Sequence, residues 1–582
     1  MRLINVNAFL AREQAMSMGR SVDRRTKVLE FHDDAATKYA ILSHRWIAPT
    51  EVDYEEIVDL VKLDVEERKE IRQRLGYRKI LDTCRQAKRD GYEWVWVDTC
   101  CIDKRSSAEL SEAINSMYRW YKNSRVCYAY LHDISDSSFP IEPNTTAYPS
   151  FGGWPEWFSR GWTLQEMIAS RNLRFFNKYW QPIGDKKTLA PTLSNITRVP
   201  QNVLIDGLSG NRPCVAQIMS WAANRTTTRV EDRAYSLMGL LDVNMSTLYG
   251  EGKKAFHRLQ LKIIHSLNDH SIFAWKFGSQ SVRPSSILAD DPSFFRDCSE
   301  MELMDPDDFI QHLNKHFPGQ LPSIDQESFS TFPVTNRGIQ IWMVLRLYRN
   351  SDSVFQAWLP CRYNQLESPA TVNLALWNSN YYRYPIAEFP VERDLQFRQV
   401  YFRYQDIPNR DITFEIDDSV ITENGLTCGD THRSTLTKNI LTLPSTRPYC
   451  VKTYSQRQSN RRFTVAFGRC FGRDWVHLVN NPSSEFNERE LMLRGPERAQ
   501  SMAKAPFRAD RSGCVWIHHI RLPGSTWIVR TSRVVWEKSR IGVRMEVFRD
   551  PGFHDGLNEW KILDVEVGVT SRRVHILLIW LL

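Results

Sequence analysis

The amino-acid sequence predicts an α/β fold in the first part of the chain, then a helical segment and a β-rich C-terminal domain. Before about residue 210, short apolar runs alternate with segments of helical periodicity, a pattern typical of a largely parallel sheet flanked by helices. Beyond about residue 330, short β-type runs separated by Pro, Gly, Asn and Asp predict a sandwich or barrel. A length of 582 residues indicates two to four domains. The expected divisions are a polar leader at 1–38, an α/β domain at 39–210, a helical extension at 211–280, a linker at 281–330 and a β-rich domain at 331–582.

Each element of the α/β domain has its own local signal. The apolar run from Tyr39 to Leu42 predicts a buried first strand. From Tyr77 to Ala87 the apolar residues share one helical face, and Gly91 ends that helix. Ser106 and Glu109 form a possible capping box for a second helix. The remaining expected elements are strands at 94–97, 126–131 and 173–176, and a helix containing residues 162–167.

The rest of the chain separates into a helical part and a β-rich part. Residues 213–275 are expected to be mainly helical, with helices at 213–224, 232–241 and 253–267. Strands of the β-rich domain are expected at 338–348, 354–362, 371–377, 462–467, 474–479, 514–521, 526–535 and 542–548.

Composition narrows the classes of partner and compartment. A net charge of +8 over the whole length, without a helix-turn-helix signature or zinc-finger spacing, argues against nucleic-acid binding. Eleven scattered cysteines without a C-x-x-C pair argue against a disulfide framework or a structural metal site. The first 25 residues lack the apolar core of a signal peptide, so we expect a cytoplasmic protein. The apolar tail at 574–582 is far shorter than the roughly 20 residues of a membrane span, so a terminal strand or a chain end altered by a gene-model error is expected rather than an anchor.

Three short motifs place polar residues at or just beyond the end of an apolar run. They are Tyr39–Trp46 (YAILSHRW), Trp94–Lys104 (WVWVDTCCIDK) and Ser159–Glu166 (SRGWTLQE). Open α/β sheets bind ligands outside the carboxyl ends of their strands, so these polar residues are expected to converge there. The resulting site residues are Ser43, His44, Arg45, Asp98, Arg160, Trp162 and Glu166.

In this order, and followed by Glu231–Val243 (EDRAYSLMGLLDV) and Tyr249–Phe256 (YGEGKKAF), the motifs resemble the heterokaryon incompatibility (HET) domain family of filamentous fungi, over about residues 39–275. The resemblance implies a flavodoxin-like fold distantly similar to TIR domains, some of which cleave NAD using a Glu in a Trp-x-x-x-Glu motif. Trp162 and Glu166 have that spacing. It also implies a role in fungal non-self recognition and cell death, with homo-oligomers or incompatibility proteins as partners.

Glu166 has the sharpest functional interpretation. It lies four residues after Trp162 and therefore on the same helical face, where packing can desolvate its carboxylate. Cleavage of the nicotinamide–ribose bond passes through an oxocarbenium-like transition state that a nearby anion stabilises, without any metal or cofactor. NAD is then the substrate. The alternative is that Trp162 belongs to the core and Glu166 is a solvated or ion-paired helix residue.

The residues after the first two strands have open roles. Ser43 can bond a ligand or cap a turn, Arg45 and Arg160 can hold a phosphate, and His44 or Trp46 can stack on a ring. Asp98 can bind ribose hydroxyls or orient Arg45. In the structural alternative Trp46 covers the sheet edge and Arg45 pairs with Asp98.

Two further hypotheses remain beside NAD cleavage. The domain can act as a non-enzymatic module that self-associates and recruits partners, and a filled, solvent-poor site around Glu166 favours this reading. Cys100 and Cys101, with His44 as base and Asp98 as its orienter, also permit a Cys-His hydrolase. An exposed Cys101 sulfur beside His44 is required for that third reading, whereas a buried sulfur indicates a core residue.

Overall fold

The computed structural model of the chain describes residues 1–549 apart from a number of short segments. The positions outside the description are 21–25, 209–211, 279–283, 323, 325, 350, 365, 387–390, 406, 408–411, 418–420, 422, 424–425, 430–434, 438–439, 444–448, 456–461, 472, 481–495, 498–513, 522–526, 537–539 and 550–582. The apolar tail at 574–582 therefore lies outside the described residues.

The N-terminal part is built on a seven-stranded sheet with the order β2-β1-β4-β3-β5-β6-β7. Its strands are β1 (Arg2–Asn5), β2 (Leu29–Phe31), β3 (Tyr39–His44), β4 (Trp94–Trp96), β5 (Val126–Tyr130), β6 (Leu173–Phe176) and β7 (Pro182–Asp185). The four central strands are parallel, and numbered along the chain they lie across the sheet in the order 2-1-3-4. This is the order of flavodoxin-like sheets, in which the direction of winding reverses between the first and third strands. The α/β fold predicted from the sequence is confirmed.

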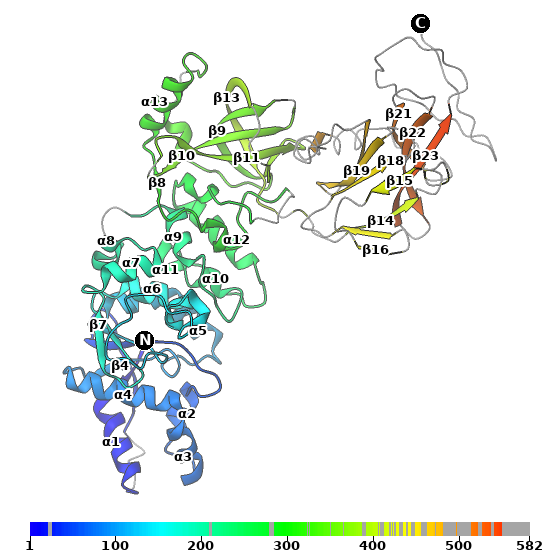
Figure 1. The fold of residues 1–582 in the computed structure, drawn as a ribbon. Coiled ribbons are helices and arrows are strands. Elements are labelled where there is room, and N and C mark those ends of the chain that lie inside the picture. The colour runs from blue at the N-terminus through cyan, green and yellow to red at the C-terminus, as the bar shows by residue number, and fades with distance from the viewer. Residues whose placement is uncertain are drawn as a thin grey trace.

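Helices cover both faces of this sheet. The connection from β3 to β4 runs through α4 (Leu75–Arg89), and the connection from β4 to β5 runs through α5 (Ser107–Asn123). Because β4 and β5 lie on opposite sides of β3, right-handed crossovers put these two helices on opposite faces. Figure 1 shows α4 below the sheet and α5 and α6 (Trp162–Ala169) above it. The remaining helices of this part are α1 (Val6–Ser17), α2 (Tyr54–Asp59), α3 (Val65–Gln73), α7 (Ala190–Thr197), α8 (Gln201–Asp206), and the 3-10 turns η1 (Pro149–Phe151) and η2 (Glu156–Ser159).

The local signals explain where these helices begin and end. At the start of α5 the Ser106 side chain accepts a hydrogen bond from the Glu109 amide. The capping box is only half formed, because the Glu109 carboxylate accepts from the Asp103 amide instead of the Ser106 amide. Gly91 follows α4 with φ +80, a left-handed conformation that glycine adopts without steric cost.

The residues before Tyr39 belong to the domain and do not form a separate leader. β1 pairs antiparallel with β4 and with β2, so both strands extend the sheet at one edge. Short strands flanked by charged residues carry little periodic signal, so the predicted domain boundary at residue 39 is wrong. β7 was missed for the same reason and closes the opposite edge, antiparallel to β6.

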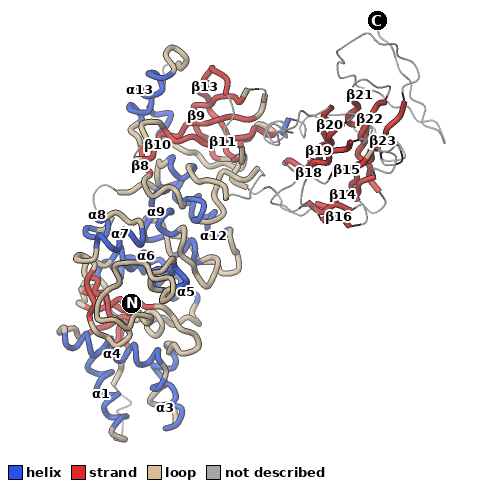
Figure 2. Tube along the Cα trace, in the orientation of Figure 1, coloured by secondary structure: helices blue, strands red, loops and turns tan. Residues whose placement is uncertain are grey.

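A helical part follows and corresponds to the expected extension. It contains α9 (Val215–Ala222), α10 (Asp232–Tyr235), α11 (Met238–Leu241), α12 (Lys254–Ser266) and η3 (His270–Phe273). The predicted helix at 232–241 is split in two, because Ser236 and Leu237 form a turn between α10 and α11. The helical part joins the sheet domain to the β-rich region above it in Figure 2.

The first β-rich unit is a closed barrel. β9 pairs with both β10 and β13, β10 also pairs with β11, and β12 joins β11 to β13. These strands are β9 (Ile339–Tyr348), β10 (Val354–Tyr363), β11 (Pro369–Trp377), β12 (Asn380–Arg383) and β13 (Val391–Phe402). The expected linker at 281–330 is instead structured: β8 (Met301–Leu303) pairs with β10 and is followed by α13 (Pro306–His316). The turns η4 (Pro292–Phe295) and η5 (Gln326–Phe329) flank them.

A second β-rich unit follows. One sheet has the order β16-β17-β14-β23-β22-β21 and the other has the order β15-β18-β19-β20. The strands are β14 (Ile412–Asp417), β15 (Thr427–Gly429), β16 (Thr435–Thr437), β17 (Ile440–Leu443), β18 (Tyr449–Ser455), β19 (Arg462–Cys470), β20 (Arg473–Asn480), β21 (Cys514–Arg521), β22 (Trp527–Trp536) and β23 (Arg540–Arg549). A small apolar cluster that includes Trp377 of the barrel and Trp475 of β20 joins the two units.

One apolar core runs from the N-terminal sheet into the barrel. It begins at Leu3 and continues through the helical part to Phe402. The α/β domain therefore has no separate core of its own within the described residues, and experiments on it require the longer chain. No helix among the described residues is long and apolar enough to cross a membrane.

Candidate functional site

The three polar motifs meet at the carboxyl edge of the parallel sheet. β3 ends at His44, β4 ends at Trp96 just before Asp98, and β5 ends at Tyr130 just before His132. The chain reverses its winding between β3 and β5, which is where ligands bind in sheets of this order. Successive residues of a strand point to opposite faces of the sheet, so the side chains of Ser43 and His44 lie on opposite faces at this edge.

On one side, Ser43 and Glu166 form the centre of a buried network. The Ser43 hydroxyl donates to the Glu166 carboxyl group, and the Trp157 indole N–H donates to Ser43 Oγ at 2.9 Å. Ser43 and Trp157 are fully buried and Glu166 is 5% exposed. The Tyr121 hydroxyl also bonds with Glu166 and donates to the Leu42 carbonyl at 2.9 Å. The carboxyl group of Glu166 is therefore enclosed by protein.

Enclosure changes the protonation of Glu166. Burial raises its pKa to about 8, although the hydrogen bond from Ser43 opposes this shift. Asp98 adds to the increase because a second negative charge nearby disfavours ionisation. At neutral pH the group is consequently mostly the uncharged acid, and it lacks the negative charge that oxocarbenium stabilisation requires.

Helix α6, which carries Glu166, is fixed at both ends. At its start the Gly161 amide bonds to the Thr226 carbonyl at 2.9 Å, and a Cβ at Gly161 would lie 2.6 Å from the Thr227 methyl group. At its end the Lys186 ammonium donates to the carbonyls of Met167 and Ser170. A Lys at a helix C-terminus satisfies carbonyls that lack partners within the helix.

A buried arginine from the helical part also supports this helix. Arg225 is 2% exposed and donates to the Arg160 carbonyl at 2.9 Å and to Thr163 Oγ1 at 3.0 Å. Burial lowers its pKa to about 9, and the nearby Glu166 opposes this shift. The role of Arg225 could not be predicted from the sequence, because a single arginine after a helix carries no signal of burial.

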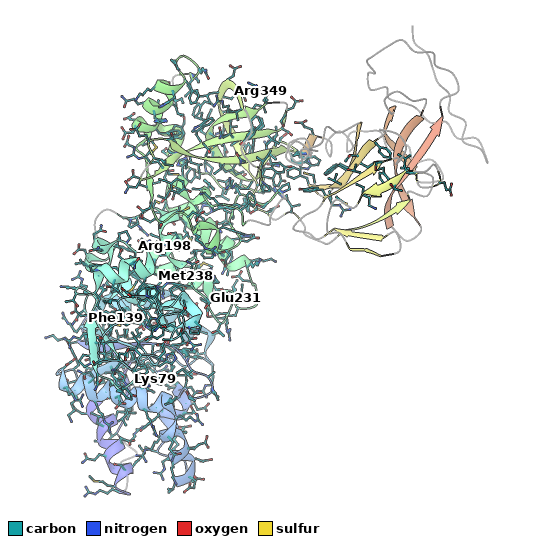
Figure 3. All side chains as sticks on the ribbon, viewed as in Figure 1. Lys79, Phe139, Arg198, Glu231, Met238 and Arg349 are labelled. Atoms are coloured by element: carbon teal, nitrogen blue, oxygen red, sulfur yellow. The ribbon has the colours of Figure 1, made fainter. Side chains whose placement is uncertain are left out.

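On the other side of the edge, His44 faces α4. Its side chain is 1% exposed, and its Nε2 lies 3.7 Å from Glu51 Oε2 and 3.8 Å from Asp98 Oδ1. Glu51 pairs with Lys79, which rises from α4 and is labelled in Figure 3. Burial alone would raise the pKa of Glu51, but His44 and Lys79 outweigh burial and hold it at about 2. Glu51 is therefore ionised.

Asp98 does not pair with Arg45, although the sequence allowed that ion pair as one alternative. Asp98 accepts a hydrogen bond from the Trp46 indole at 2.8 Å, and Arg45 pairs with Glu156. Trp46 is 40% exposed and carries the Lys104 ammonium 4.0 Å from its ring centroid. It therefore lies over the rim of the site and does not seal the sheet edge.

The Arg45–Glu156 pair belongs to a second polar group at the end of β5. His132 Nε2 lies 3.5 Å from Glu156 Oε2, and the Glu156 amide donates to Asp133 Oδ2 at 2.8 Å. Glu156 comes from η2 at the end of the long loop that follows β5. His132, Asp133 and Glu156 were missed from the sequence, because loop residues show no periodicity.

Trp162 and Arg160 have other partners than those expected. Trp162 is half-buried and its side chain bonds with Asp232 of α10, which lies in the helical part. The indole joined to the Ser43–Glu166 network is that of Trp157. Arg160 donates to Thr228 Oγ1 at 3.3 Å and lies near enough to Glu166 to lower its pKa. Neither its contacts nor those of Trp162 identify a ligand.

The cysteines lack the properties of a nucleophile. Cys100 is fully buried and Cys101 is 2% exposed, as expected for core residues. The hydrogen bond with Cys101 and burial raise the pKa of the Cys100 thiol well above its ordinary value. Thiolate formation is disfavoured under these conditions. Among the described residues there is also no group of His, Cys, Asp and Glu arranged to hold a metal ion.

Comparison with known proteins matches the segment that carries the first two motifs. Residues 39–150 match the family model described as Heterokaryon incompatibility protein (HET). The chain carries a HET domain. Over 227 residues it is 43% identical to Vegetative incompatibility protein HET-E-1 of Podospora anserina. That match covers 39% of this chain and 16% of the relative, so the chain corresponds to only a small part of it.

The matched range contains only part of the site. It includes β3, β4 and β5 with Ser43, His44 and Asp98, but it ends before Glu156, Glu166 and Arg225. The structure brings α6 and the helical part onto the same edge as the matched strands. The expected similarity to TIR domains stays a prediction.

Proposed function

We propose that this protein takes part in a fungal heterokaryon incompatibility response, with the HET domain as its effector part. The family match at 39–150 and the 43% identity to an incompatibility protein support this role. Within it, the geometry favours a non-enzymatic module that acts by self-association and recruitment of incompatibility partners. One observation carries this preference: Glu166 is enclosed, hydrogen-bonded to Ser43 and mostly uncharged at neutral pH.

NAD cleavage is the second candidate, and a separate observation supports it. Ser43 and Glu166 lie at the switch point of the sheet, next to His44 and Asp98, whose Nδ1 and Oδ1 atoms make no hydrogen bond among the described residues. A movement of η2 that separates Trp157 from Ser43 would expose the Glu166 carboxyl group and lower its pKa toward the usual value. NAD would then be the substrate, with no metal or cofactor involved.

The test separates the two by following NAD and growth in the same cells. We expect expression of the full chain in a fungal host to arrest growth with cellular NAD unchanged, and Glu166→Gln to arrest growth equally. Gln keeps the shape and the bond to Ser43 while removing the acid. The matched control is Glu66→Gln on α3, where the side chain is 83% exposed. All variants are compared at equal soluble protein.

A fall in NAD with release of nicotinamide by the purified chain, both abolished by Glu166→Gln and retained by Glu66→Gln, would reject the module and establish the enzyme. Arrest that is absent with every variant at normal abundance would reject the effector role itself.

A further inference from the structure

Two arginines in series connect the segment before the barrel with the candidate site. Arg233 of α10 binds the Asp291 carboxylate through two hydrogen bonds, from Nε at 2.9 Å and from Nη2 at 2.7 Å. The same guanidinium donates to the carbonyl of Arg225 and, at 3.2 Å, to the carbonyl of Ala222. Asp291 also accepts a hydrogen bond from the Ser293 amide at 2.9 Å and so caps η4. The position of Arg233 therefore depends on the chain that leads from η4 into β8 of the barrel.

The second arginine extends this connection to α6 and η2. Arg225 donates to Thr163 Oγ1 at 3.0 Å, and the Thr163 hydroxyl donates to the Trp157 carbonyl at 2.7 Å, the shorter of its two acceptor distances. The indole of Trp157 donates in turn to Ser43. These residues form one hydrogen-bonded chain, which we name the arginine relay: Asp291, Arg233, Arg225, Thr163 and Trp157. The relay ends at the closed network around Ser43.

Backbone bonds beside the relay join the same parts of the molecule. The Thr226 amide donates to the Ser159 carbonyl at 2.6 Å, and the Gly161 amide donates to the Thr226 carbonyl at 2.9 Å. Ser159 ends η2, and Gly161 directly precedes α6. Because Arg225 directly precedes Thr226, a shift of Arg225 disturbs both bonds. One short segment of the helical part therefore fixes the two elements that close the candidate site.

The burial of Arg225 makes the closed arrangement costly. Arg225 is 2% exposed, and its Nη1 donates to two neutral oxygens, those of the Arg160 carbonyl and of Thr163. Its Nη2 has no hydrogen-bond partner among the described residues. Burying a cation without an ionised partner is unfavourable, and the neighbouring Glu166 is mostly uncharged at neutral pH. Other contacts must offset this cost, so the loss of one of them shifts the balance toward an open arrangement.

We propose that the arginine relay is an inhibitory contact through which the segment around η4 holds the candidate site closed. While Arg233 binds Asp291, the relay keeps Trp157 on Ser43 and the Glu166 carboxyl group enclosed. A partner that draws η4 away from α10 breaks the relay at Asp291, and η2 then leaves the strand edge. The regulatory meaning of the relay rests on the effector role proposed above, whereas its mechanical coupling is measured without growth or NAD. Failure of the coupling would therefore leave the effector role intact.

Hydrogen exchange of the full chain, followed by mass spectrometry of its peptides, tests the coupling. Asp291→Asn removes the charge that Arg233 binds, while the Asn side chain still caps η4. We expect the amides of η2 and α6 (residues 156–169) to exchange at least about fivefold faster, with α4 and β9 unchanged, because the substitution reaches the site through the relay. Equal acceleration in all four elements, or none in η2 and α6, would overturn the proposal.

The matched control is Asp297→Asn, the same substitution in the same segment. The Asp297 carboxylate pairs with Lys276 at 3.6 Å, and its side chain is 61% exposed, so it lies outside the relay. Exchange at 156–169 should stay as in the unaltered protein. Acceleration there equal to that of Asp291→Asn would mean that any lost charge in this segment loosens the site, and the relay would be rejected.

A second variant opens the site from its other end. Trp157→Phe removes the N–H that binds Ser43 and keeps an aromatic ring in the core. Because coupling between two sites is reciprocal, we expect the amides of α10 to exchange about fivefold faster in this variant, and those of α12 to be unchanged. Unchanged exchange in α10, or equal acceleration in α10 and α12, would contradict a relay between Trp157 and Arg233.

Discussion

Two groups of polar residues lie side by side at the end of the parallel sheet, and they differ in how well they are satisfied. Ser43, Trp157 and Glu166 bond to one another in a closed network. His44 and Asp98, one residue and one strand away, keep unpaired atoms and lie beside ionised Glu51. A satisfied buried network rigidifies a fold, whereas an unsatisfied one costs stability.

Residues of a single motif therefore fall into two groups, one that is fully hydrogen-bonded and one that is not. The segment Tyr39–Trp46 supplies both groups, because alternate residues of a strand point to opposite faces. Ser43 faces α6 and the Trp157 indole, while His44 faces α4 and Lys79. If the distinction is correct, changes in the closed network should reduce stability strongly, and changes in the open group should reduce it little.

The largest effect is expected for Trp157→Ala. Trp157 is fully buried, packs edge-on against Phe158 and Phe175, and supplies the hydrogen bond to Ser43. Truncating a buried Trp lowers the free energy of unfolding by about 3–5 kcal/mol. Urea unfolding measures the loss, and hydrogen exchange of the β3 amides assigns it to this domain.

The control for that prediction is Trp46→Ala in the open group. Trp46 is 40% exposed, so its removal leaves no comparable cavity and should cost less than half as much. Equal losses for the two tryptophans would show that both sides of the edge contribute alike to the fold.

The next effect is the pH dependence of stability that Glu166, the carboxyl group of the closed network, should produce. The pKa of Glu166 is raised to about 8 in the folded state from an ordinary value near 4.5. Between these values the unfolded state is ionised and the folded state binds a proton, so stability falls as pH rises through this range. The slope is at most about 1.4 kcal/mol per pH unit and levels off above pH 8.

Glu166→Gln removes this titration while keeping the shape of the side chain. We expect the variant to gain stability relative to the unaltered protein as pH increases from about 5 to 8, and to show no relative change below about pH 4. Thermal unfolding at a series of pH values measures the difference. A constant difference across the series would mean that Glu166 is ionised in the folded state and that its network is open.

The sequence predicted the secondary-structure elements and the convergence of the motifs, but it did not predict most contacts within the site. The parallel pairing and the β6 bounds followed from the alternation of apolar runs and helices, and the rule on carboxyl ends brought Ser43 together with Glu166. The partners of Arg45 could not be predicted, because Glu156 and His132 belong to a loop whose path is set by tertiary packing. The burial of Glu166 could not be predicted either. It results from contacts of α6 with Ser43 and Tyr121, which lie over 40 residues away in the chain.

The smallest effect is expected for Asp98→Asn in the open group. Its side chain is 21% exposed, one oxygen already lacks a partner, and Asn retains an acceptor for the Trp46 indole. Loss of its charge weakens the attraction to Lys79, but it also removes a charge that disfavours ionisation of the buried Glu166. The free energy of unfolding should change by less than about 1 kcal/mol in either direction, as for partly exposed charges generally. Urea unfolding beside the Trp157→Ala variant provides the measurement. A loss of several kcal/mol would place Asp98 in the structural network and remove the distinction between the closed and open groups.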